Sequence, residues 1–395
     1  MIRPLFDEPL NTEIAYSPRR SKRYLGSPSI VALSDDSILV SHDFFGPNSP
    51  KNKYGESNLT HIYKSRDNGL SWERISKIRN AFWSSLFYLN SSVYLIGCSS
   101  EYGDIVIRKS KDRGKTWTIP YNNKTGLLFK SGVNKEPPNY HSAPVPIVFH
   151  NDRIYRAFED NENRKWPQGF KSFIISAKTD SDLLKASSWE ISNKSKFSIP
   201  DHLNGINTKK AGWLEGNAVL APNGKIWNIL RVHSVPSSNI AAISKLSSDN
   251  KEFCFEPSKG FIKFPGGMSK FTIRFSPTVR KYLTISNEVN DEKNPYQRNR
   301  LVLASSEDLI NWKTRKVLIY EPEITNFFKK FLNFVIPSKK SYFLTSKIGF
   351  QYADWVEYEN DLLIVVRTAY NNAQNFHDSN YITFYRLRNL TKQLS

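Results

Sequence analysis

The sequence has no apolar run long enough to cross a membrane as a helix. Such a helix needs about 20 consecutive apolar residues, and no stretch of the 395 residues provides them. Residues 1–7 also lack the apolar stretch of a signal peptide. We therefore expect no membrane partner. The location stays open: the protein is secreted or periplasmic if a signal peptide has been removed, and cytoplasmic otherwise.

Cysteine is nearly absent, with two residues in the whole chain. This density excludes a disulfide scaffold. Cys98 ends the apolar run 93–98 and Cys254 lies between two phenylalanines, so both are predicted to be buried. C-x-x-C, H-x-x-x-H and calcium-loop spacings are missing, as are phosphate-binding glycine loops. We expect no cofactor and no metal, although scattered ligands in a channel could still hold a structural ion.

Helical periodicity is also nearly absent, apart from one short segment at residues 324–332. Short runs rich in β-branched and aromatic residues recur instead, separated by Gly, Asn and Asp turns. The clearest of these runs are 37–41, 92–98, 105–109, 153–158, 225–232, 281–286, 301–305, 361–367 and 381–387. The pattern predicts an all-β fold of the sandwich, barrel or propeller kind.

An internal repeat favours the propeller. Residues 65–72 and 110–117 both fit S-x-D-x-G-x-x-W, and residues 305–312 are a degraded copy in which Glu307 replaces Asp and Leu309 replaces Gly. A more distorted copy lies at 177–189. Asp accepts backbone N–H bonds within a turn and Gly supplies a positive φ, while Trp packs between sheets. The repeat is therefore predicted to hold a hairpin between outer strands, without a catalytic role.

The repeat spacing predicts the number of blades. The first two copies begin 45 residues apart, at 65 and 110, so the chain holds six or seven blades. We expect seven, with six as the alternative, in a single domain over residues 1–395. Residues 1–23 would form an N-terminal extension or an outer strand. Strand 381–387 or a segment before Gly26 would close the ring.

The net charge of +19 favours an anionic partner. Lys and Arg are spread along the chain rather than clustered, which argues against nucleic acid. Aromatic residues make up 13% of the chain, and aromatic rings suit stacking on sugars. We therefore expect an acidic oligo- or polysaccharide as partner, and a monomeric protein.

The repeat resembles the Asp boxes of sialidase-like propellers. Sialidases use an Arg-Ile-Pro in the first blade, three arginines that bind a carboxylate, a Tyr nucleophile and a Glu that activates it. Residues 215–231 resemble their Glu…Arg strand pair, and Tyr352 with residues 362–367 resembles their Tyr blade. Residues 24–30 match the Pro and the strand but lack the arginine, which weakens the resemblance to true sialidases.

The chain is more similar to a seven-bladed branch of this superfamily. That branch includes α-L-rhamnosidases that release rhamnose from glucuronic acid, and ulvan-type polysaccharide lyases. The similar segments are 24–47, 81–118, 140–160, 212–232, 264–275 and 349–387. The resemblance implies an exo-acting glycoside hydrolase on a uronate-containing or sulfated glycan. A lyase that cleaves at a uronic acid and a non-catalytic propeller that binds glycan or protein are the alternatives.

Resemblance to the rhamnosidases implies that His42 is the catalytic acid or base, since imidazole titrates near neutral pH. The alternative is that His42 only orders its loop through Asp43. Resemblance to the lyases points to His141 as base, with Tyr140 or Tyr352 as acid. Arg231 or Asn217 would then neutralise the carboxylate. The alternative for His141 is a hydrogen bond to the channel wall.

Further candidates bind substrate. Trp213, Glu215, Asn217 and Arg231 lie on one predicted hairpin, where a buried Glu–Arg pair is the alternative reading. Lys270 follows two glycines that let the backbone approach a ligand. Tyr352, Arg367 and His377 belong to the last blade, and His377 lies in the amide-rich segment 371–380. That segment either bonds sugar hydroxyls or is a solvated loop.

Overall fold

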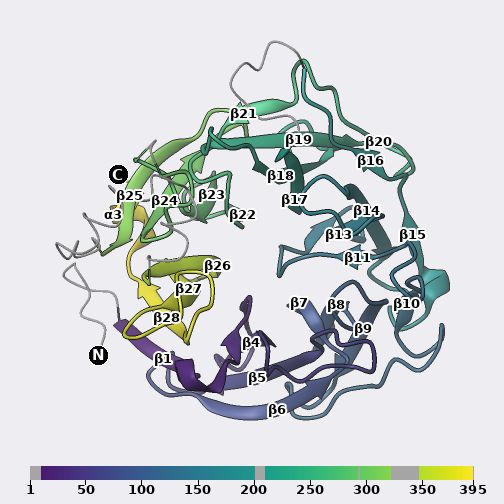
Figure 1. The fold of residues 1–395 in the computed structure, drawn as a ribbon, viewed down its shortest axis with the longest axis horizontal. Helices are drawn as coiled ribbons and strands as arrows, with labels where there is room; N and C mark the ends of the chain where they lie inside the picture. Colours follow the sequence, from purple (N-terminus) through teal and green to yellow (C-terminus); the bar gives the residue numbers. More distant parts are fainter. Residues whose placement is uncertain (1–9, 201–209, 292–293, 322–346, 395) are drawn as a thin grey trace, which may run out of the picture.

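The protein is an all-β propeller (Figure 1). The computed structural model describes residues 10–200, 210–291, 294–321 and 347–394. These residues form six sheets arranged as a ring, and each sheet is one blade. The propeller prediction is confirmed. The expectation of seven blades was wrong, and the alternative of six is correct, because insertions between strands lengthen several blades beyond 45 residues. The predicted helix at 324–332 lies outside the described residues.

The first three blades follow one another along the chain. Blade 1 comprises β2 (Tyr24–Leu25), β3 (Ser29–Ala32), β4 (Ile38–Phe45), β5 (Leu59–Ser65) and β6 (Glu73–Arg79). Blade 2 comprises β7 (Phe82–Leu89), β8 (Ser92–Cys98), β9 (Ile105–Ser110) and β10 (Leu127–Phe129). Blade 3 comprises β11 (Tyr140–His141), β12 (Val148–His150), β13 (Arg153–Asn161), β14 (Phe170–Lys178), β15 (Trp189–Ile191) and β16 (Ser195–Lys196).

The other three blades complete the ring. Blade 4 comprises β17 (Gly212–Leu220), β18 (Ile226–His233), β19 (Ile240–Leu246), β20 (Phe253–Cys254) and β21 (Phe261–Lys263). Blade 5 comprises β22 (Thr272–Ser276), β23 (Lys281–Ser286), β24 (Arg300–Ser306) and β25 (Lys313–Tyr320). Blade 6 comprises β26 (Gly349–Tyr358), β27 (Asp361–Ala369), β28 (Tyr381–Leu387) and β1 (Leu10–Tyr16). The described helices are short: η1 (Arg19–Ser21), η2 (Ala186–Ser188) and α3 (Leu390–Leu394).

Both ends of the chain build blade 6. β1 pairs antiparallel with β28, so the N-terminal strand is the outer strand of a sheet whose other strands lie near the C-terminus. This pairing gives the last blade its fourth strand and leaves no gap in the ring (Figure 1).

Apolar clusters fill the interfaces between neighbouring blades. One cluster joins blades 1 and 2 through residues such as Leu39 and Leu95, and another joins blades 6 and 1 through residues such as Val365 and Val40. The remaining interfaces have similar clusters. The inner and middle strands therefore bury both of their faces against neighbouring sheets, which explains the continuous apolar runs in the sequence, whereas outer strands such as β6 and β25 are largely exposed.

The repeated Ser-x-Asp segments form turns between the outer strands. In blade 1, Ser65 Oγ donates to Asp67 Oδ1 (2.7 Å) and accepts from the Gly69 amide (2.8 Å). In blade 2, Ser110 Oγ and Asp112 Oδ1 make the equivalent bond at 2.8 Å. These bonds satisfy backbone groups that the strands leave unpaired, so the segments have the structural role that their chemistry predicts.

The third copy differs from its predicted alignment by one residue. Ser306 Oγ donates to Asp308 Oδ1 (2.9 Å), and Asp308 Oδ1 accepts from the Asn311 amide (2.7 Å). The carboxylate therefore comes from Asp308, and the expectation that Glu307 replaces it was wrong. The turn is one residue shorter than in blades 1 and 2, and Leu309 takes the positive φ of 67° that glycine has there.

Two more turns of this kind lie in blades 3 and 4. Asp182 Oδ1 accepts from the Leu184 amide (3.1 Å), and Asp249 Oδ1 accepts from the Lys251 amide (3.2 Å). The sequence pattern missed the copy at Asp249 because buried Phe253 stands where the other copies have Trp.

The turns define the two faces of the ring. Ile38 pairs with Ala32 and Ser65, whereas Asp43 pairs with Thr60 at the other end of the same sheet. We call the face that carries the Ser-x-Asp turns the lower face and the opposite one the upper face. Cys98 is buried as predicted, but Cys254 is exposed because it lies on the short outer strand β20. Among the described residues, no helix is long and apolar enough to span a membrane.

Candidate functional site

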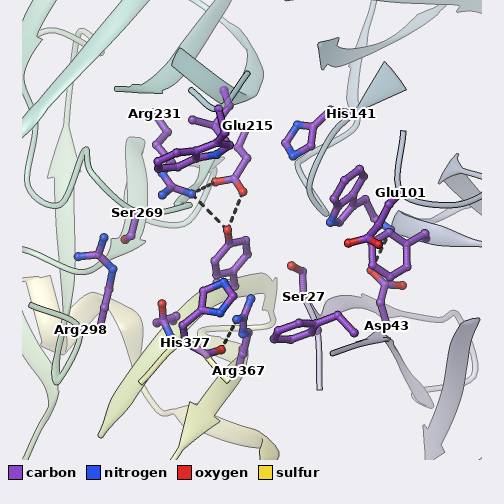
Figure 2. Close-up of a pocket in the computed structure, with 18 of the residues that line it drawn as sticks. Ser27, Asp43, Glu101, His141, Glu215, Arg231, Ser269, Arg298, Arg367 and His377 are labelled. Atoms are coloured by element: carbon purple, nitrogen blue, oxygen red, sulfur yellow. Dashed lines mark hydrogen bonds and ion pairs between the residues drawn. The ribbon is translucent and has the colours of Figure 1, made fainter. Parts of the chain in front are cut away.

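A cavity of about 330 Å³ opens at the upper face, and all six blades line it (Figure 2). Each blade contributes at least one residue from its innermost strand or from the segment that leads into it. One such residue from each blade is, in blade order, Ser27, Trp83, His141, Glu215, Ser269 and Tyr352. Residues far apart in the sequence therefore meet at the centre of the ring.

Three of these residues lie at irregular positions in their strands. Trp83, Glu215 and Tyr352 have positive φ values of 49°, 56° and 54°. The strand register shifts at the same points in blades 2, 4 and 6. Such bulges change the direction of a side chain and are common next to active sites. A non-glycine residue with positive φ costs free energy, which the surrounding structure has to offset.

Tyr352, Glu215 and Arg231 form one hydrogen-bonded group. The Tyr352 hydroxyl donates to Glu215 Oε1 (2.7 Å), and Arg231 Nη1 donates to Glu215 Oε2 (2.7 Å) and to the Tyr352 oxygen (3.2 Å). Burial raises the pKa of Glu215, but the charge of Arg231, the nearby His141 and the hydrogen bonds from Arg231 and Tyr352 together outweigh it, so the pKa lies below its usual range. Burial, and then the Glu215 charge, raise the pKa of Tyr352. The resting pair is therefore a carboxylate and a neutral phenol.

Three arginines line the cavity. Arg231 Nε and Arg298 Nη2 both donate to the Met268 carbonyl oxygen at 3.0 Å, which holds the two guanidinium groups side by side. The guanidinium carbon of Arg367 lies 4.7 Å from the ring centre of Phe45 and 4.8 Å from that of Tyr352. Arg367 also donates to the His377 carbonyl oxygen. Three fixed cations at one cavity favour an anionic ligand.

Two carboxyl groups lie across the cavity from Arg231, as Figure 2 shows. Asp43 accepts from Thr60 Oγ1 (2.6 Å) and from the Trp83 amide (2.8 Å), while Glu101 accepts from the Ser57 amide (3.1 Å). Burial raises the pKa of Asp43 to about 7, despite its two donors, and the Glu101 charge adds to the rise. Asp43 can therefore gain and lose a proton near neutral pH.

The carboxylate of Glu159 holds the His141 ring in place. Its Nδ1 lies 3.0 Å from Glu159 Oε2, and Glu159 Oε1 accepts from the Gly216 amide (3.0 Å). The ring centre of His141 is 4.3 Å from that of Trp83. The contact with Trp83 and the bonds of Glu159 fix the imidazole plane and connect blades 2, 3 and 4.

Aromatic residues form part of the cavity wall. Trp83, Tyr102, Trp166 and Tyr296 line it, and the Trp166 side chain is 47% exposed. The Trp166 ring centre lies 4.6 Å from that of His233, whose pKa burial lowers to about 3. The imidazole is thus uncharged at neutral pH, and the Trp166 ring that it supports offers an aromatic face of the kind on which sugar rings stack.

The structure brings six of the predicted site residues to the cavity. They are His141, Glu215, Arg231, Tyr352, Arg367 and His377. His377 comes from the predicted amide-rich loop. Much of that loop bonds to itself: Asn375 Oδ1 accepts from the amides of His377 and Asp378, both at 2.8 Å. Its amides therefore mainly order the loop.

His42 lies outside the cavity, which disagrees with its expected catalytic role. It is fully buried, its Nδ1 lies 3.0 Å from the Asp43 carbonyl oxygen, and its ring packs against Phe44 and Tyr63. Successive side chains of a strand point to opposite faces, so β4 presents Asp43 to the cavity and turns His42 away. Burial lowers the His42 pKa to about 4.

Three predicted substrate-binding residues are also outside the cavity lining. Trp213 is buried and its Nε1 donates to the Phe170 carbonyl oxygen (3.1 Å). Asn217 Oδ1 accepts from the Ile273 amide (2.9 Å), which joins blades 4 and 5. Lys270 Nζ donates to the Ala353 carbonyl oxygen (2.9 Å), which joins blades 5 and 6. These side chains connect blades and have no access to a ligand in the cavity.

Asp43, Glu101 and Arg298 line the cavity but were not among the predicted residues. Asp43 carried a detectable signal, since it is the acidic neighbour of His42 on an apolar strand. Arg298 lies just before the strand that ends at the third Ser-x-Asp turn. The position of that turn in the sequence could therefore have indicated Arg298 as a residue at the opposite end of the strand, on the upper face. Glu101 follows β8 in a connecting segment, where no sequence pattern distinguishes it.

Comparison with known proteins identifies the fold. No family model and no curated protein matches the sequence. Among solved structures, an α-L-arabinanase from Penicillium chrysogenum in complex with arabinobiose is 13% identical, with a TM-score of 0.58 over 98% of this chain and 99% of that one. An α-L-arabinofuranosidase from Fusarium graminearum with an iminosugar inhibitor is 15% identical, with a TM-score of 0.59 over 98% and 99% of the two chains.

A sialidase from Trypanosoma rangeli is 14% identical, with a TM-score of 0.60 over 99% of this chain and 60% of the sialidase. The chain has the sialidase-like propeller fold. At these identities the similarity establishes the fold alone. The described residues contain no group of three or more His, Cys, Asp or Glu side chains arranged to hold a metal ion.

Proposed function

We propose that this protein is a glycoside hydrolase that acts on an acidic sugar, with Tyr352 as nucleophile. The observation that carries the proposal is the 2.7 Å hydrogen bond from the Tyr352 hydroxyl to Glu215 inside a cavity lined by three arginines. A hydroxyl paired with a carboxylate base, which a third group in turn orients, is the arrangement expected of an activated nucleophile. Arg231 is that third group.

In the first step, the Tyr352 oxygen attacks the anomeric carbon of the sugar. Glu215 takes the phenol proton as the new C–O bond forms, and the glycosidic C–O bond breaks. The leaving oxygen receives a proton from Asp43, whose pKa of about 7 keeps much of it protonated near neutral pH. The products of this step are a tyrosyl-bound sugar and the released alcohol.

In the second step, the Asp43 carboxylate takes a proton from water, whose oxygen attacks the anomeric carbon. The bond to Tyr352 breaks, and Glu215 returns the proton to the phenol oxygen. Two displacements at one carbon retain the anomeric configuration. Asp43 acts first as acid and then as base, which its raised pKa permits.

A neutral nucleophile suits an anionic sugar. A carboxylate nucleophile would repel a sugar carboxylate in a cavity of low dielectric constant, whereas a phenol does not. Arg231, Arg298 and Arg367 supply three cations for the acidic group. This charge arrangement supports a uronate or a related acidic unit in the cavity, in agreement with the expected acidic glycan.

The α-L-rhamnosidase type of mechanism has less support. It rests on His42, which is buried away from the cavity. The lyase alternative has one observation in its favour, because Glu159 orients His141 at the cavity wall and could make it a base. In a lyase, His141 would be the base and Tyr352 the acid. Glu215 would then accept no proton in the reaction, and its hydrogen bond to Tyr352 would have no catalytic role. We therefore prefer the hydrolase.

One assay separates these functions. The protein is incubated with acidic oligosaccharides and with aryl glycosides of uronic acids, and released sugar and ultraviolet absorbance are followed together. We expect free sugar with retained configuration, read by NMR of the first product, and no new absorbance. Absorbance from an unsaturated uronate would instead identify a lyase. Binding without either product would identify a non-catalytic glycan-binding propeller.

The arginines give a second test of the acidic substrate. Arg298→Gln should raise KM for the acidic glycoside at least about tenfold, the loss expected for one charged hydrogen-bonding partner. The same change should leave KM for the corresponding neutral glycoside within about twofold. An equal effect on both substrates would show that Arg298 supports only the shape of the cavity.

A further inference from the structure

A cluster of cations lies beside the cavity on the upper face. The segment between β1 and β2 carries Arg19, Arg20, Lys22 and Arg23, and all four side chains are exposed. None of them has a carboxylate oxygen within 4.0 Å among the residues that the structure describes. We call residues 19–23 the basic loop.

The basic loop borders an open hollow of about 720 Å³. Arg19, Arg20 and Lys22 line it, together with Tyr24, Pro47, Asn372 and Gln374. The hollow adjoins the cavity through a row of rings. The Tyr24 and Phe45 ring centres are 5.5 Å apart, and those of Phe45 and His377 are 5.3 Å apart. Phe45 and His377 belong to the cavity wall, so one line of aromatic residues separates the two spaces.

The basic loop is held in place. Ser17 Oγ donates to the Arg23 carbonyl oxygen (2.6 Å), and Asn48 Nδ2 donates to the Ser21 carbonyl oxygen (3.0 Å). Arg19 Nε donates to Gln374 Oε1 (2.8 Å), which connects the basic loop to the loop that carries His377. The cations are therefore presented from a fixed backbone, and a ligand would lose little free energy in ordering it.

Glycine makes this close packing possible. Gly46, with a φ of 101°, passes beneath the basic loop, and a Cβ there would lie 2.5 Å from the Tyr24 ring and 2.9 Å from the Lys22 carbonyl oxygen. A side chain at this position would clash with both, so the basic loop or Tyr24 would have to move. The fold thus holds the four cations of the basic loop close to one another beside the cavity. This arrangement persists although the like charges repel each other.

We propose that the hollow at the basic loop binds anionic groups of a glycan chain whose reacting sugar lies in the cavity. This inference rests on the proposed function and refines it, because the substrate becomes a chain with several anionic groups. The arginines inside the cavity are sufficient to bind the charge of a single acidic sugar. Further cations beside it add affinity only when the substrate carries further carboxylates or sulfates.

The test is binding of labelled polyanions to the full chain, measured by fluorescence anisotropy. The probes are polygalacturonate, which carries carboxylates, dextran sulfate, which carries sulfates, and neutral dextran. The Glu215→Gln background prevents turnover. The variant Arg19→Gln/Arg20→Gln/Lys22→Gln is compared with Lys111→Gln/Lys115→Gln/Lys313→Gln, which removes the same charge from exposed lysines at the lower-face turns.

We expect the basic-loop variant to bind its preferred polyanion at least about tenfold more weakly, with a smaller salt dependence. The lower-face variant should stay within about twofold, and neutral dextran should not bind. The polyanion that shows the larger loss identifies the anionic group. An equal loss in both variants, or no loss in either, overturns the proposal. So does a larger loss for labelled duplex DNA or for phosphatidylserine vesicles than for both glycans.

Turnover separates this inference from the proposed function. In the chain with native Glu215, the basic-loop variant should keep kcat/KM for a small aryl glycoside and lose it for the polymer. If no glycoside is cleaved but polyanion binding still depends on the basic loop, the proposed function is wrong and the binding site remains. If both substrates are cleaved equally by both variants, the basic loop takes no part in substrate binding.

Discussion

The Tyr352 hydroxyl lies 2.7 Å from Glu215 Oε1, although 137 residues separate the two in sequence. Each residue has a positive φ and lies at a register shift in the innermost strand of its blade. The two bulges turn both side chains out of the strand pattern and toward the centre of the ring. Both residues to which we assign the chemistry thus have a strained backbone.

Removing either partner should stop turnover without unfolding the protein. Tyr352→Phe and Glu215→Gln should each lower kcat by about 10³-fold or more, since one loses the nucleophile and the other its base. Steady-state kinetics measures the loss, and circular dichroism verifies the fold. His42→Gln is the control from outside the cavity and should keep kcat within about threefold. If His42→Gln were as inactive as Tyr352→Phe, our assignment of the site would be wrong.

Asp43 should set the alkaline limit of activity. Its pKa of about 7 means that the acid form needed in the first step is lost as pH rises through that value. The kcat/KM profile should therefore fall above about pH 7. In Asp43→Asn this limb should disappear together with most of the activity on poor leaving groups. Aryl glycosides with acidic leaving groups should lose less, because their departure needs no proton. An unchanged alkaline limb in Asp43→Asn would assign the proton to another group.

Buried histidines should make the protein sensitive to acid. Burial lowers the pKa of His42 to about 4 and the pKa values of His61 and His233 to about 3, against 6.5 when exposed. The unfolded chain binds these protons first, so stability is present above pH 6.5 and falls as pH decreases below it. Each group contributes up to about 1.4 kcal/mol per pH unit.

Asp43 has the opposite effect over the same range. Its pKa is raised from 3.8 to about 7, so the folded state binds its proton first and gains stability as pH falls from 7 to 4. As pH falls, the three histidines destabilise the folded protein and Asp43 stabilises it. The net effect equals that of two histidines, so the free energy of unfolding should fall by at most about 3 kcal/mol per pH unit between pH 6.5 and 4. Urea denaturation at several pH values measures this slope. Asp43→Asn should make it steeper, and a flat profile would contradict the assignment.

The third Ser-x-Asp turn offers a matched pair of variants. Asp308→Ala removes the acceptor of the Asn311 amide and should lower the free energy of unfolding by about 1–2 kcal/mol. Glu307→Ala removes an exposed side chain whose ion pair with Lys281 lies at the surface, so its effect should stay below about 0.5 kcal/mol. Chemical denaturation measures both. If Glu307→Ala proved the more damaging, the register seen in the structure would be wrong.

Much of the fold could be predicted because its signals are local. The predicted run 92–98 is strand β8, and the run 381–387 is strand β28. Both runs are bounded by turn residues, and burial between neighbouring sheets requires their apolar character. The number of blades was less accessible, because the predicted 45-residue period does not hold where connections are longer, as between β9 and β10.

The candidate site was predictable in part. Glu215, Arg231 and Tyr352 could be found because strand position and resemblance pointed to the same residues. His42 was predicted and Asp43 was not, because the chemistry of imidazole is easier to recognise than the direction of a side chain on β4. Trp213 and Asn217 lie on the same hairpin as Glu215 but pack between blades. Glu215 reaches the cavity because the strand bulges at this residue, and no sequence pattern shows the bulge.

The pairing of β1 with β28 has a consequence for how this protein is made. During synthesis the strand Leu10–Tyr16 leaves the ribosome before the other strands of the ring, and its partner Tyr381–Leu387 leaves after them. The first strand therefore remains an unpaired edge while the other blades are produced, and an unpaired edge can pair with other chains. The nascent chain thus has to stay soluble with its ring open. A chaperone that covers residues 10–16 until residues 381–387 have emerged would increase the yield of closed protein.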